Sequence, residues 1–486
     1  MMNKNSKKLP SPLLSAVPIL TLVILLYFTI RTFGSDALSG GSQIVLLTST
    51  AITSMLAMIF CKVRWHQIEK AICNNILGVA TAIIILLLIG ALSGSWMVSG
   101  IVPTMIYYGM HIIHPSFFLA STCIICAIVS IMTGSSWTTI ATIGVALMGI
   151  GEAQGFSPGM IAGAIISGAY FGDKISPLSD TTVLASSVTN TPLFSHIRYM
   201  MFTTVPSLII TLTLFVIMGF SHTSADAGQI TAYANSLKDT FFISPWLLSV
   251  PVITAILIAK KVPSLITLFV SAVLAGICSI ICQPDLLVQI AGSDITTGNA
   301  LFKGSFISFY GSTSIDTGNI ALNDLVATRG MSGMLSTIWL IICAMCFGGA
   351  MQATGMLESL TSVFVRFMKK GVGMVSSTVF SGLFLNIVTA DQYISIILTG
   401  NMFKEVYKNN GYESRLLSRT TEDAVTVTSV LIPWNSCGMT QSTILGVPTL
   451  TYLPYCFFNL LSPLMSIIVM AIGYKIKRVI PILSEE

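Results

Sequence analysis

The stretch GDKISPLSDTT, residues 172–182, places three charged side chains, a proline and a run of hydroxyl groups inside a strongly apolar part of the chain. Pro177 has no backbone N–H and interrupts the hydrogen-bond ladder of a helix, so nearby carbonyl groups are left free. Irregular backbone is tolerated at membrane depth only where protein or a cavity surrounds it. The stretch therefore predicts a discontinuous membrane helix with a polar site at the break.

The composition of the whole chain is typical of a polytopic membrane protein. Of its 486 residues, 53% are hydrophobic and 9% are charged, whereas soluble domains carry about 25% charged residues. Apolar runs close to the ~20 residues needed for a spanning helix recur from end to end. We expect ten spanning helices, at residues 12–30, 44–61, 72–96, 158–185, 194–220, 242–260, 264–282, 332–354, 416–445 and 450–474.

Two further apolar segments, 115–152 and 373–404, each carry a polar interruption near the middle. We interpret each as a re-entrant hairpin, although a pair of full crossings would give the same sidedness. Most of the 24 Lys and Arg residues then lie on the side of both termini. Since Lys and Arg are enriched in cytoplasmic loops, both termini are predicted to be cytoplasmic, in a bacterial inner membrane.

The two halves of the chain resemble each other at a spacing of 256 residues. Pro177 falls on Pro433, and TGSSW (133–137) falls on TADQY (389–393). With the predicted topology these repeats are inverted, which is typical of secondary transporters when matching helices are broken. The predicted organisation is a first repeat at 1–220, an outer linker at 221–241 and a second repeat at 242–486 with an outer loop at 283–331.

The polar interruptions form two hairpin tips and two helix breaks, and together they predict an ion site. Free carbonyls, hydroxyls and carboxylates are the oxygen ligands that hard cations prefer. An intramembrane carboxylate costs roughly 2.5–3.5 kcal/mol on insertion scales, so function is its default interpretation. Asp180 and Asp391 are the leading ion-carrying residues, with a helix N-cap as the structural alternative for either.

The full set of candidate binding residues is Thr133, Ser135, Ser136, Asp173, Ser179, Asp180, Thr181, Thr389, Asp391, Gln392, Asn435 and Ser436, with helix breaks at Pro177 and Pro433 and a Na⁺ site predicted at Ser135, Asp180 and Asp391. Asp173 and Lys174 could instead form a local ion pair or lie at the edge of a cavity. Glu422 and Asp423 are further candidates for ion contact on the predicted helix that contains Arg419. Arg419 and Asp423 are four residues apart, so a salt bridge on the helix surface is the alternative there.

Five segments resemble NhaC-type sodium/proton antiporters: GAYFGDKISPLSDTT (168–182), NTPLFSHIRYM (190–200), TADQYISIILTGNMFKEVY (389–407), SRTTEDAVTVTSVLIPWN (418–435) and GVPTLTYLPYCFFNLLSP (446–463). The likeness spans most of the chain, and the segment after Pro433 is less rich in Gly and Ala than the family pattern. The resemblance implies a two-repeat fold with re-entrant hairpins and an elevator-like transport domain. Within the superfamily some relatives exchange malate and lactate or carry amino acids, so the resemblance leaves the substrate open.

Two functions fit these features. The first is a Na⁺/H⁺ antiporter in which a buried carboxylate binds either ion and only singly occupied states change access. The second is a Na⁺- or H⁺-coupled transporter of a small carboxylate or amino acid, which the many hydroxyl and amide groups favour. An enzyme is not expected because no nucleophile–base–histidine set lies in the predicted membrane core. A channel is less favoured, since the paired helix breaks of the two halves are typical of alternating access.

The expected partners follow from these functions. They are Na⁺, H⁺ and the lipid bilayer. The second function adds a small organic anion or an amino acid as substrate, and a homodimer is one possible assembly. No cofactor beyond the coupling ions is expected. The formal net charge of only +5 does not suggest nucleic-acid binding.

Overall fold

A computed structural model describes residues 9–33, 40–221, 227–260, 262–292, 297–318, 323, 326–366 and 371–476. Within these ranges nearly all regular structure is helical, and an isolated antiparallel bridge joins Thr313 to Thr328. Eight of the described helices are long and apolar enough to cross a membrane, or up to ten if each of two sharply bent helix pairs is one span. The chain is therefore an all-helical, multi-span membrane protein, as its composition predicts.

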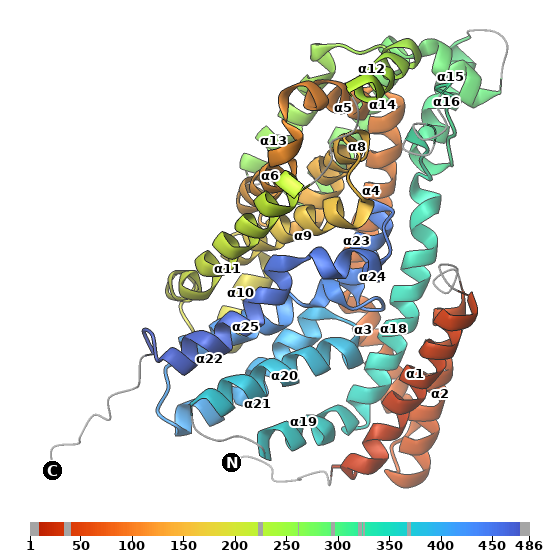
Figure 1. Cartoon of the computed structure of the whole chain (residues 1–486). Helices are drawn as coiled ribbons and strands as arrows, with labels where there is room; N and C mark the ends of the chain where they lie inside the picture. The colour runs from red at the N-terminus through yellow and green to blue at the C-terminus, as the bar shows by residue number, and fades with distance from the viewer. Residues whose placement is uncertain are drawn as a thin grey trace.

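One group of helices packs around a long helix of the second half, α18 (Leu335–Ala353), at the right of Figure 1. α2 (Gly41–Phe60) and α3 (Trp65–Gly78) lie along α18, and α1 (Pro12–Phe33) packs on α2. Buried apolar side chains of these four helices form one hydrophobic core.

A second group contains most of the first half together with α14 (Ser264–Cys282). α14 packs on α4 (Ala80–Val98), and α6 (Phe118–Thr133) lies along α9 (Pro158–Ile175). The other helices of this part are α5 (Ile101–Ile112), α7 (Ser136–Thr139), α8 (Val145–Ala153), α10 (Asp180–Val188), α11 (Leu193–Ser221), α12 (Ala227–Thr240), α13 (Ser249–Ala259), α15 (Pro284–Ala291) and α16 (Gly298–Tyr310).

The remaining helices of the second half lie in the middle and lower parts of Figure 1, and several of them contact α9, α10 and α11. They are α19 (Met356–Arg366), α20 (Val372–Thr389), α21 (Gln392–Asn409), α22 (Ser414–Thr421), α23 (Ser436–Leu445), α24 (Thr449–Tyr452) and α25 (Phe457–Ile472). α20 packs against α21, and α25 packs against both α9 and α11. The charged end of α9 is thereby enclosed by elements of both halves.

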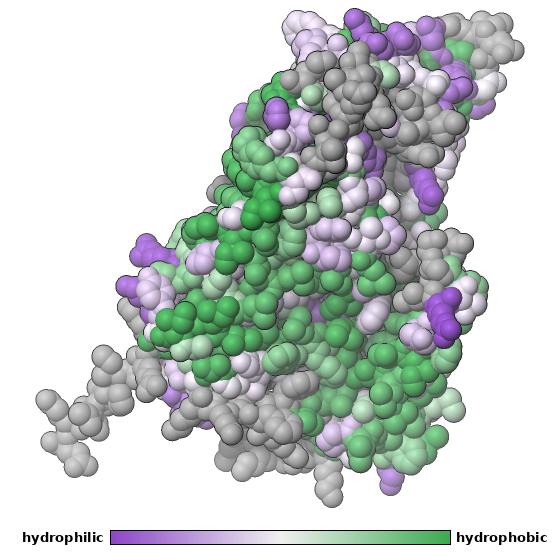
Figure 2. Space-filling model, in the orientation of Figure 1, coloured by the Kyte–Doolittle hydropathy of each residue, from purple (hydrophilic) through white to green (hydrophobic). Residues whose placement is uncertain are grey.

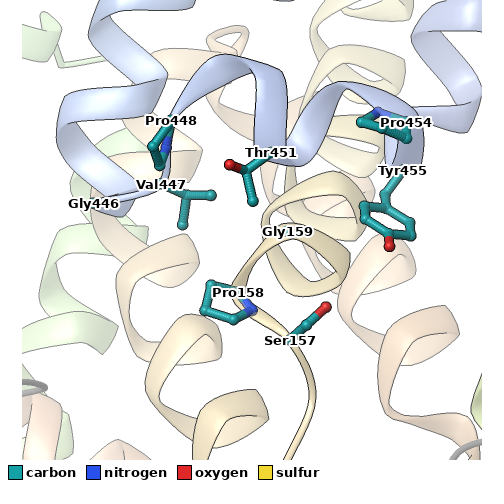
Figure 3. A pocket seen from close by; sticks show the side chains of 9 residues that line it. All are labelled: Ser157, Pro158, Gly159, Gly446, Val447, Pro448, Thr451, Pro454 and Tyr455. Atoms are coloured by element: carbon teal, nitrogen blue, oxygen red, sulfur yellow. The ribbon is translucent and has the colours of Figure 1, made fainter. Parts of the chain in front are cut away.

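Glycines on α9 allow these neighbours to approach closely. A Cβ on Gly159 would lie 2.6 Å from the Thr451 carbonyl oxygen, and a Cβ on Gly163 would lie 2.4 Å from Cβ of Tyr455. Small residues at a four-residue spacing permit such helix contacts in membranes. Figure 3 shows the Thr451 side chain pointing toward the start of α9. The close contact fixes α9 against the chain around α24, and so fixes the position of the break at its other end.

Several elements differ from the sequence-based expectation. Helix α12 occupies the predicted linker 221–241, and α15 and α16 lie in the predicted outer loop 283–331. Local capping explains the starts of the latter two helices: Pro284 lies in the first turn of α15, and the Thr297 side chain accepts a hydrogen bond from the Ala300 N–H at 3.2 Å. The predicted helix 72–96 is two helices that meet at Val79.

The surface agrees with a membrane location. Figure 2 shows a broad apolar surface over the middle and lower parts of the visible face, while hydrophilic residues gather at the top end, over α12 and α15. Large exposed apolar side chains such as Ile24, Ile59 and Phe220 contribute to this kind of surface. Such an extent of exposed apolar area is expected where lipid, rather than water, is the solvent.

Candidate functional site

The two predicted hairpin tips have the same local structure at the predicted spacing of 256 residues. α6 ends at Thr133 and α20 ends at Thr389, and each is followed by a residue with left-handed backbone, Gly134 (φ 66°) or Ala390 (φ 57°). In the first tip the Thr133 hydroxyl accepts from the Ser135 N–H at 3.1 Å, and in the second the Thr389 hydroxyl accepts from the Asp391 N–H at 3.2 Å.

The next residue of each tip caps a new helix. The Ser135 side chain accepts from the Thr138 N–H at 3.2 Å, and the Asp391 carboxylate accepts from the Ile394 N–H at 3.0 Å. Both polar tips are thus built by one hydrogen-bond pattern that satisfies the backbone where the helix is interrupted. The inverted orientation of the two halves stays a prediction.

The first helix break lies where the opening stretch predicts it. α9 ends at Ile175, and the Ser179 side chain caps α10 by accepting from the Thr182 N–H at 3.4 Å. Asp173, on the last turn of α9, is buried and faces the first hairpin tip. Its carboxylate accepts from the Ser136 N–H at 3.1 Å and from the Ser136 hydroxyl at 2.7 Å. Break and tip of the first half are therefore joined through Asp173.

The second break is longer and more irregular than the predicted helix 416–445. α22 is followed by a π-helical segment (Glu422–Thr426), a 3₁₀ turn (Ser429–Leu431) and Pro433, and Asn435 caps α23 by accepting from the Cys437 N–H at 3.1 Å. A π-helical segment interrupts normal helix pairing and frequently marks a functional region.

The second break also contacts its own hairpin tip. The Ser436 hydroxyl donates to the Asp391 carboxylate at 3.2 Å, and the Ser436 N–H donates to the Ala390 carbonyl at 2.8 Å. The Gln392 amide oxygen accepts from Ser429 at 3.1 Å. Both carboxylate oxygens of Asp391 thus have protein donors, which supports the capping alternative for this residue.

Lys174 does not pair with Asp173, contrary to the local ion pair considered from the sequence. Its ammonium contacts the Asp423 carboxylate of the π-helical segment and donates to the Ser462 hydroxyl at 2.9 Å. Both charged side chains are fully buried. This ion pair therefore joins the helix break of the first half, where Lys174 lies, to the helix break of the second half, where Asp423 lies.

Arg419 completes the buried charges around this pair. Its Nε lies 4.0 Å from the second Asp423 oxygen, and the guanidinium stacks 4.9 Å from the centre of the Tyr199 ring. Arg419 and Asp423 are both fully buried, so their contact is not the helix-surface salt bridge considered from the sequence. None of the guanidinium nitrogens has a hydrogen-bond partner in the described part of the chain.

Glu422 is the buried carboxylate that this cluster leaves least compensated. Its Oε1 accepts from the Thr181 hydroxyl of α10 at 3.3 Å, while Oε2 has no hydrogen-bond partner among the described residues. The Thr181 hydroxyl also lies 2.9 Å from the Ser179 hydroxyl. A carboxylate without a paired cation in a buried position requires a bound proton or a bound metal ion. The arrangement can therefore bind either species in competition.

Asp180 has a different environment from the buried acids. It is the first residue of α10 and is exposed on the described surface. Ser135 and Asp391 cap two other helices, so the three proposed Na⁺ ligands belong to three separate helix starts. Their joint Na⁺ site stays a prediction.

The pocket in Figure 3 lies at the opposite end of α9 from Lys174. It has a volume of about 490 Å³ and is enclosed by Pro158, Val447, Pro448, Thr451 and Tyr455, among others. Its lining contains no charged side chain. Since ion binding requires charge or converging oxygen ligands, the buried cluster at the breaks is the stronger candidate site.

Asp391 offers a direct test of capping against ion binding. We expect Asp391→Ala to lower stability by about 1 kcal/mol because an N-cap is lost. Asp391→Asn keeps a capping side chain, so its free energy of unfolding should lie within about 0.5 kcal/mol of that of the unchanged protein. Thermal unfolding in detergent measures both. If the Asn variant melts normally but no longer transports, the carboxylate charge is functional in addition to the cap.

Sequence reasoning gave too little weight to Glu422, Asp423, Lys174 and Arg419. A signal was present, because Lys174 is a lone cation at membrane depth and a buried charge requires a partner. The partner lies 249 residues away in sequence. No local pattern links the two positions, so only the fold identifies the pair.

Comparisons with known proteins agree with the geometry. A sequence profile of the Na⁺/H⁺ antiporter family matches residues 9–183 and 168–474. The chain is 37% identical over 419 residues to the Na⁺/H⁺ antiporter NhaC of Alkalihalophilus pseudofirmus, which covers 86% of this chain and 88% of that protein.

Two further relatives are named for other exchange activities. A malate-2H⁺/Na⁺-lactate antiporter of Bacillus subtilis is also 37% identical, over 86% of each chain. An arginine/ornithine antiporter of Halobacterium salinarum is 33% identical over 96% of this chain and 93% of its own length.

Proposed function

Because the chain belongs to the Na⁺/H⁺ antiporter family, we propose that it exchanges Na⁺ for H⁺ across a bacterial inner membrane by alternating access. The single observation that carries this proposal is Glu422, a fully buried carboxylate in the π-helical segment of the second break, with one oxygen that has no hydrogen-bond partner among the described residues. Thr181 provides a further oxygen atom at 3.3 Å from Glu422, and the buried Asp173 carboxylate of the first break is proposed as another. The proposed cycle needs no cofactor beyond the two coupling ions.

In the proposed mechanism Na⁺ and H⁺ compete for the same carboxylate. Protonation makes Glu422 neutral, and a bound Na⁺ balances its charge, so either occupied state removes the cost of a bare buried charge. The empty, charged site is costly to move through the membrane. If only occupied states change access, movement of one ion in one direction requires return of the other.

The remaining sequence-predicted residues keep roles in this proposal. Ser136 holds Asp173 in place, and Ser179, Asn435 and Asp391 cap the broken helices. Asp180, exposed at the start of α10, is proposed as a carboxylate at the edge of the site. The excess of Lys and Arg on the side of both termini supports cytoplasmic termini.

The direct test uses purified protein in proteoliposomes with an imposed pH gradient and no organic solute. Addition of NaCl should dissipate the gradient and accumulate ²²Na⁺, whereas choline chloride should do neither. Empty liposomes provide the background. A gradient that is insensitive to Na⁺, in vesicles that contain correctly folded protein, would exclude Na⁺/H⁺ exchange.

A second candidate function is coupled transport of a small organic acid or amino acid. The observation that favours it is the pair of buried cations, Lys174 and Arg419, of which Arg419 has guanidinium nitrogens without hydrogen-bond partners in the described chain. A guanidinium is suited to bind a carboxylate. The malate/lactate and arginine/ornithine relatives support testing these solutes. Saturable uptake of radiolabelled solute would favour this function, and its absence would leave Na⁺/H⁺ exchange.

A further inference from the structure

A positively charged pocket lies apart from the ion site, where α11 begins and α25 ends. Its volume is about 400 Å³, and its walls include Phe194, Arg198, Tyr199, Phe202, Arg415 and Lys475. The three basic side chains come from three segments: α11, α22 and the turn after α25. Elements far apart in sequence thus bring three cations to one small volume.

The charges in this pocket are only partly neutralised. Arg415 forms an ion pair with Glu413, and the pair is partly exposed. Arg198 and Lys475 form no salt bridge with any residue that the structure describes. The pocket therefore keeps two uncompensated positive charges, and its natural ligand is an anion. A volume of this size suits a polyatomic group such as a phosphate better than a single small ion.

Aromatic side chains extend the pocket toward an apolar surface. Phe202 packs edge-to-face on Tyr199 and on Tyr474, at ring-centre distances of 5.8 and 5.6 Å. Phe194 at 72% and Tyr474 at 50% relative exposure continue this surface outward. Aromatic residues of this kind gather at the boundary between lipid and water. A ligand that fills both regions has an anionic head and an apolar tail.

We propose that this pocket binds the phosphate headgroup of an anionic phospholipid. Basic pockets between membrane helices are suited to such headgroups. Arg198 and Lys475 contact the phosphate, and the acyl chains lie against Phe194 and Tyr474. Free inorganic phosphate has the same charged group but would not use the aromatic surface, which is why the lipid is favoured.

The pocket also contacts the buried charges of the candidate ion site. The Tyr199 ring contacts two guanidinium groups, with Arg415 at 5.3 Å from its centre and Arg419 at 4.9 Å. The Tyr199 hydroxyl donates to the Lys475 carbonyl at 3.1 Å. A bound headgroup that orders Lys475 therefore also holds Tyr199, and through it Arg419 beside Asp423. We infer that the lipid raises the exchange rate, and this second step rests on the proposed function.

The binding test uses the full chain in detergent with short-chain phosphatidylglycerol, phosphatidylcholine or inorganic phosphate, followed by native mass spectrometry and thermal shift. The unchanged protein should prefer phosphatidylglycerol. The double variant Arg198→Gln/Lys475→Gln should bind it about twenty-fivefold more weakly, from two contacts worth about fivefold each. The matched pair Lys62→Gln/Lys70→Gln removes two exposed cations elsewhere and should bind normally. Equal loss in both variants, or equal binding of inorganic phosphate, would overturn the lipid site.

The coupling test measures exchange in vesicles with and without phosphatidylglycerol. The unchanged protein should be faster with the anionic lipid, whereas R198Q/K475Q should have one rate in both and match the unchanged protein in phosphatidylcholine. Tyr199→Leu should bind the lipid but lose its effect on rate. A lipid effect that persists in R198Q/K475Q would overturn the coupling. Absence of exchange in every vesicle would contradict the proposed function while the binding result still stands.

Discussion

The Glu422→Gln variant should fold and insert but lose Na⁺-dependent proton movement, down to the background of empty vesicles. Glutamine keeps the shape of the side chain and can still accept a hydrogen bond from Thr181, which lies 3.3 Å from Oε1 in the unchanged protein. It cannot exchange a proton or balance the charge of Na⁺. Because the variant removes an uncompensated buried charge, its melting temperature should be unchanged or higher.

The measurement for Glu422 is fluorescence of a pH-sensitive dye in proteoliposomes, with protein content checked in each preparation. Glu405→Gln, an exposed acid on α21, is the matched control and should exchange normally. Glu422→Asp keeps the carboxylate and should retain part of the activity. Asp180→Asn tests whether Asp180, rather than Glu422, carries the ion. If E422Q exchanged Na⁺ for H⁺ normally and D180N did not, the ion carrier would be Asp180.

The breaks and hairpin tips could be predicted from sequence because their signals are local. Pro177, Pro433 and the polar tips interrupt apolar runs, and each is matched 256 residues away. The structure repeats the hydrogen bonds of Thr133 and Ser135 at Thr389 and Asp391. A pattern of short-range chemistry was sufficient here, since capping and helix interruption depend on neighbouring residues.

The composition of the site could not be predicted in the same way. Whether an intramembrane acid binds ions, caps a helix or pairs with a lysine depends on which elements pack beside it. Asp391 has two protein donors, Asp423 has Lys174, and Glu422 has one hydroxyl. All three acids lie in apolar segments near a predicted helix interruption, so the sequence does not distinguish them. Long-range packing determines the role of each. The π-helical segment around Glu422 likewise has no sequence signal of its own.

The helices missed in the predicted outer segments have another cause. Residues 283–331 are rich in Gly, Ser and Thr, which favour loops in general. α15 and α16 nevertheless form because Pro284 and Thr297 provide good helix starts and because the two helices pack on each other. Tertiary contact outweighs a weak intrinsic preference in such short helices.

The largest effect on stability should come from separating Lys174 and Asp423. Removal of one partner of a buried ion pair leaves an uncompensated charge and costs about 3–5 kcal/mol. The two single variants should differ. Lys174→Met leaves Asp423 with Arg419 at 4.0 Å, whereas Asp423→Asn leaves two buried cations without a carboxylate between them. D423N should therefore melt at the lower temperature.

The double variant K174M/D423N contains neither charge of the pair and should melt above D423N, although Arg419 remains without Asp423 beside it. A double-mutant cycle in thermal unfolding would quantify the coupling. The same cycle on the partly exposed Glu413–Arg415 pair is the control and should show a coupling below about 1 kcal/mol. A double variant as unstable as the sum of the single changes would mean that Lys174 and Asp423 act independently. Strong coupling would instead show that the two breaks are held together by this pair, so that a change at one break is transmitted to the other.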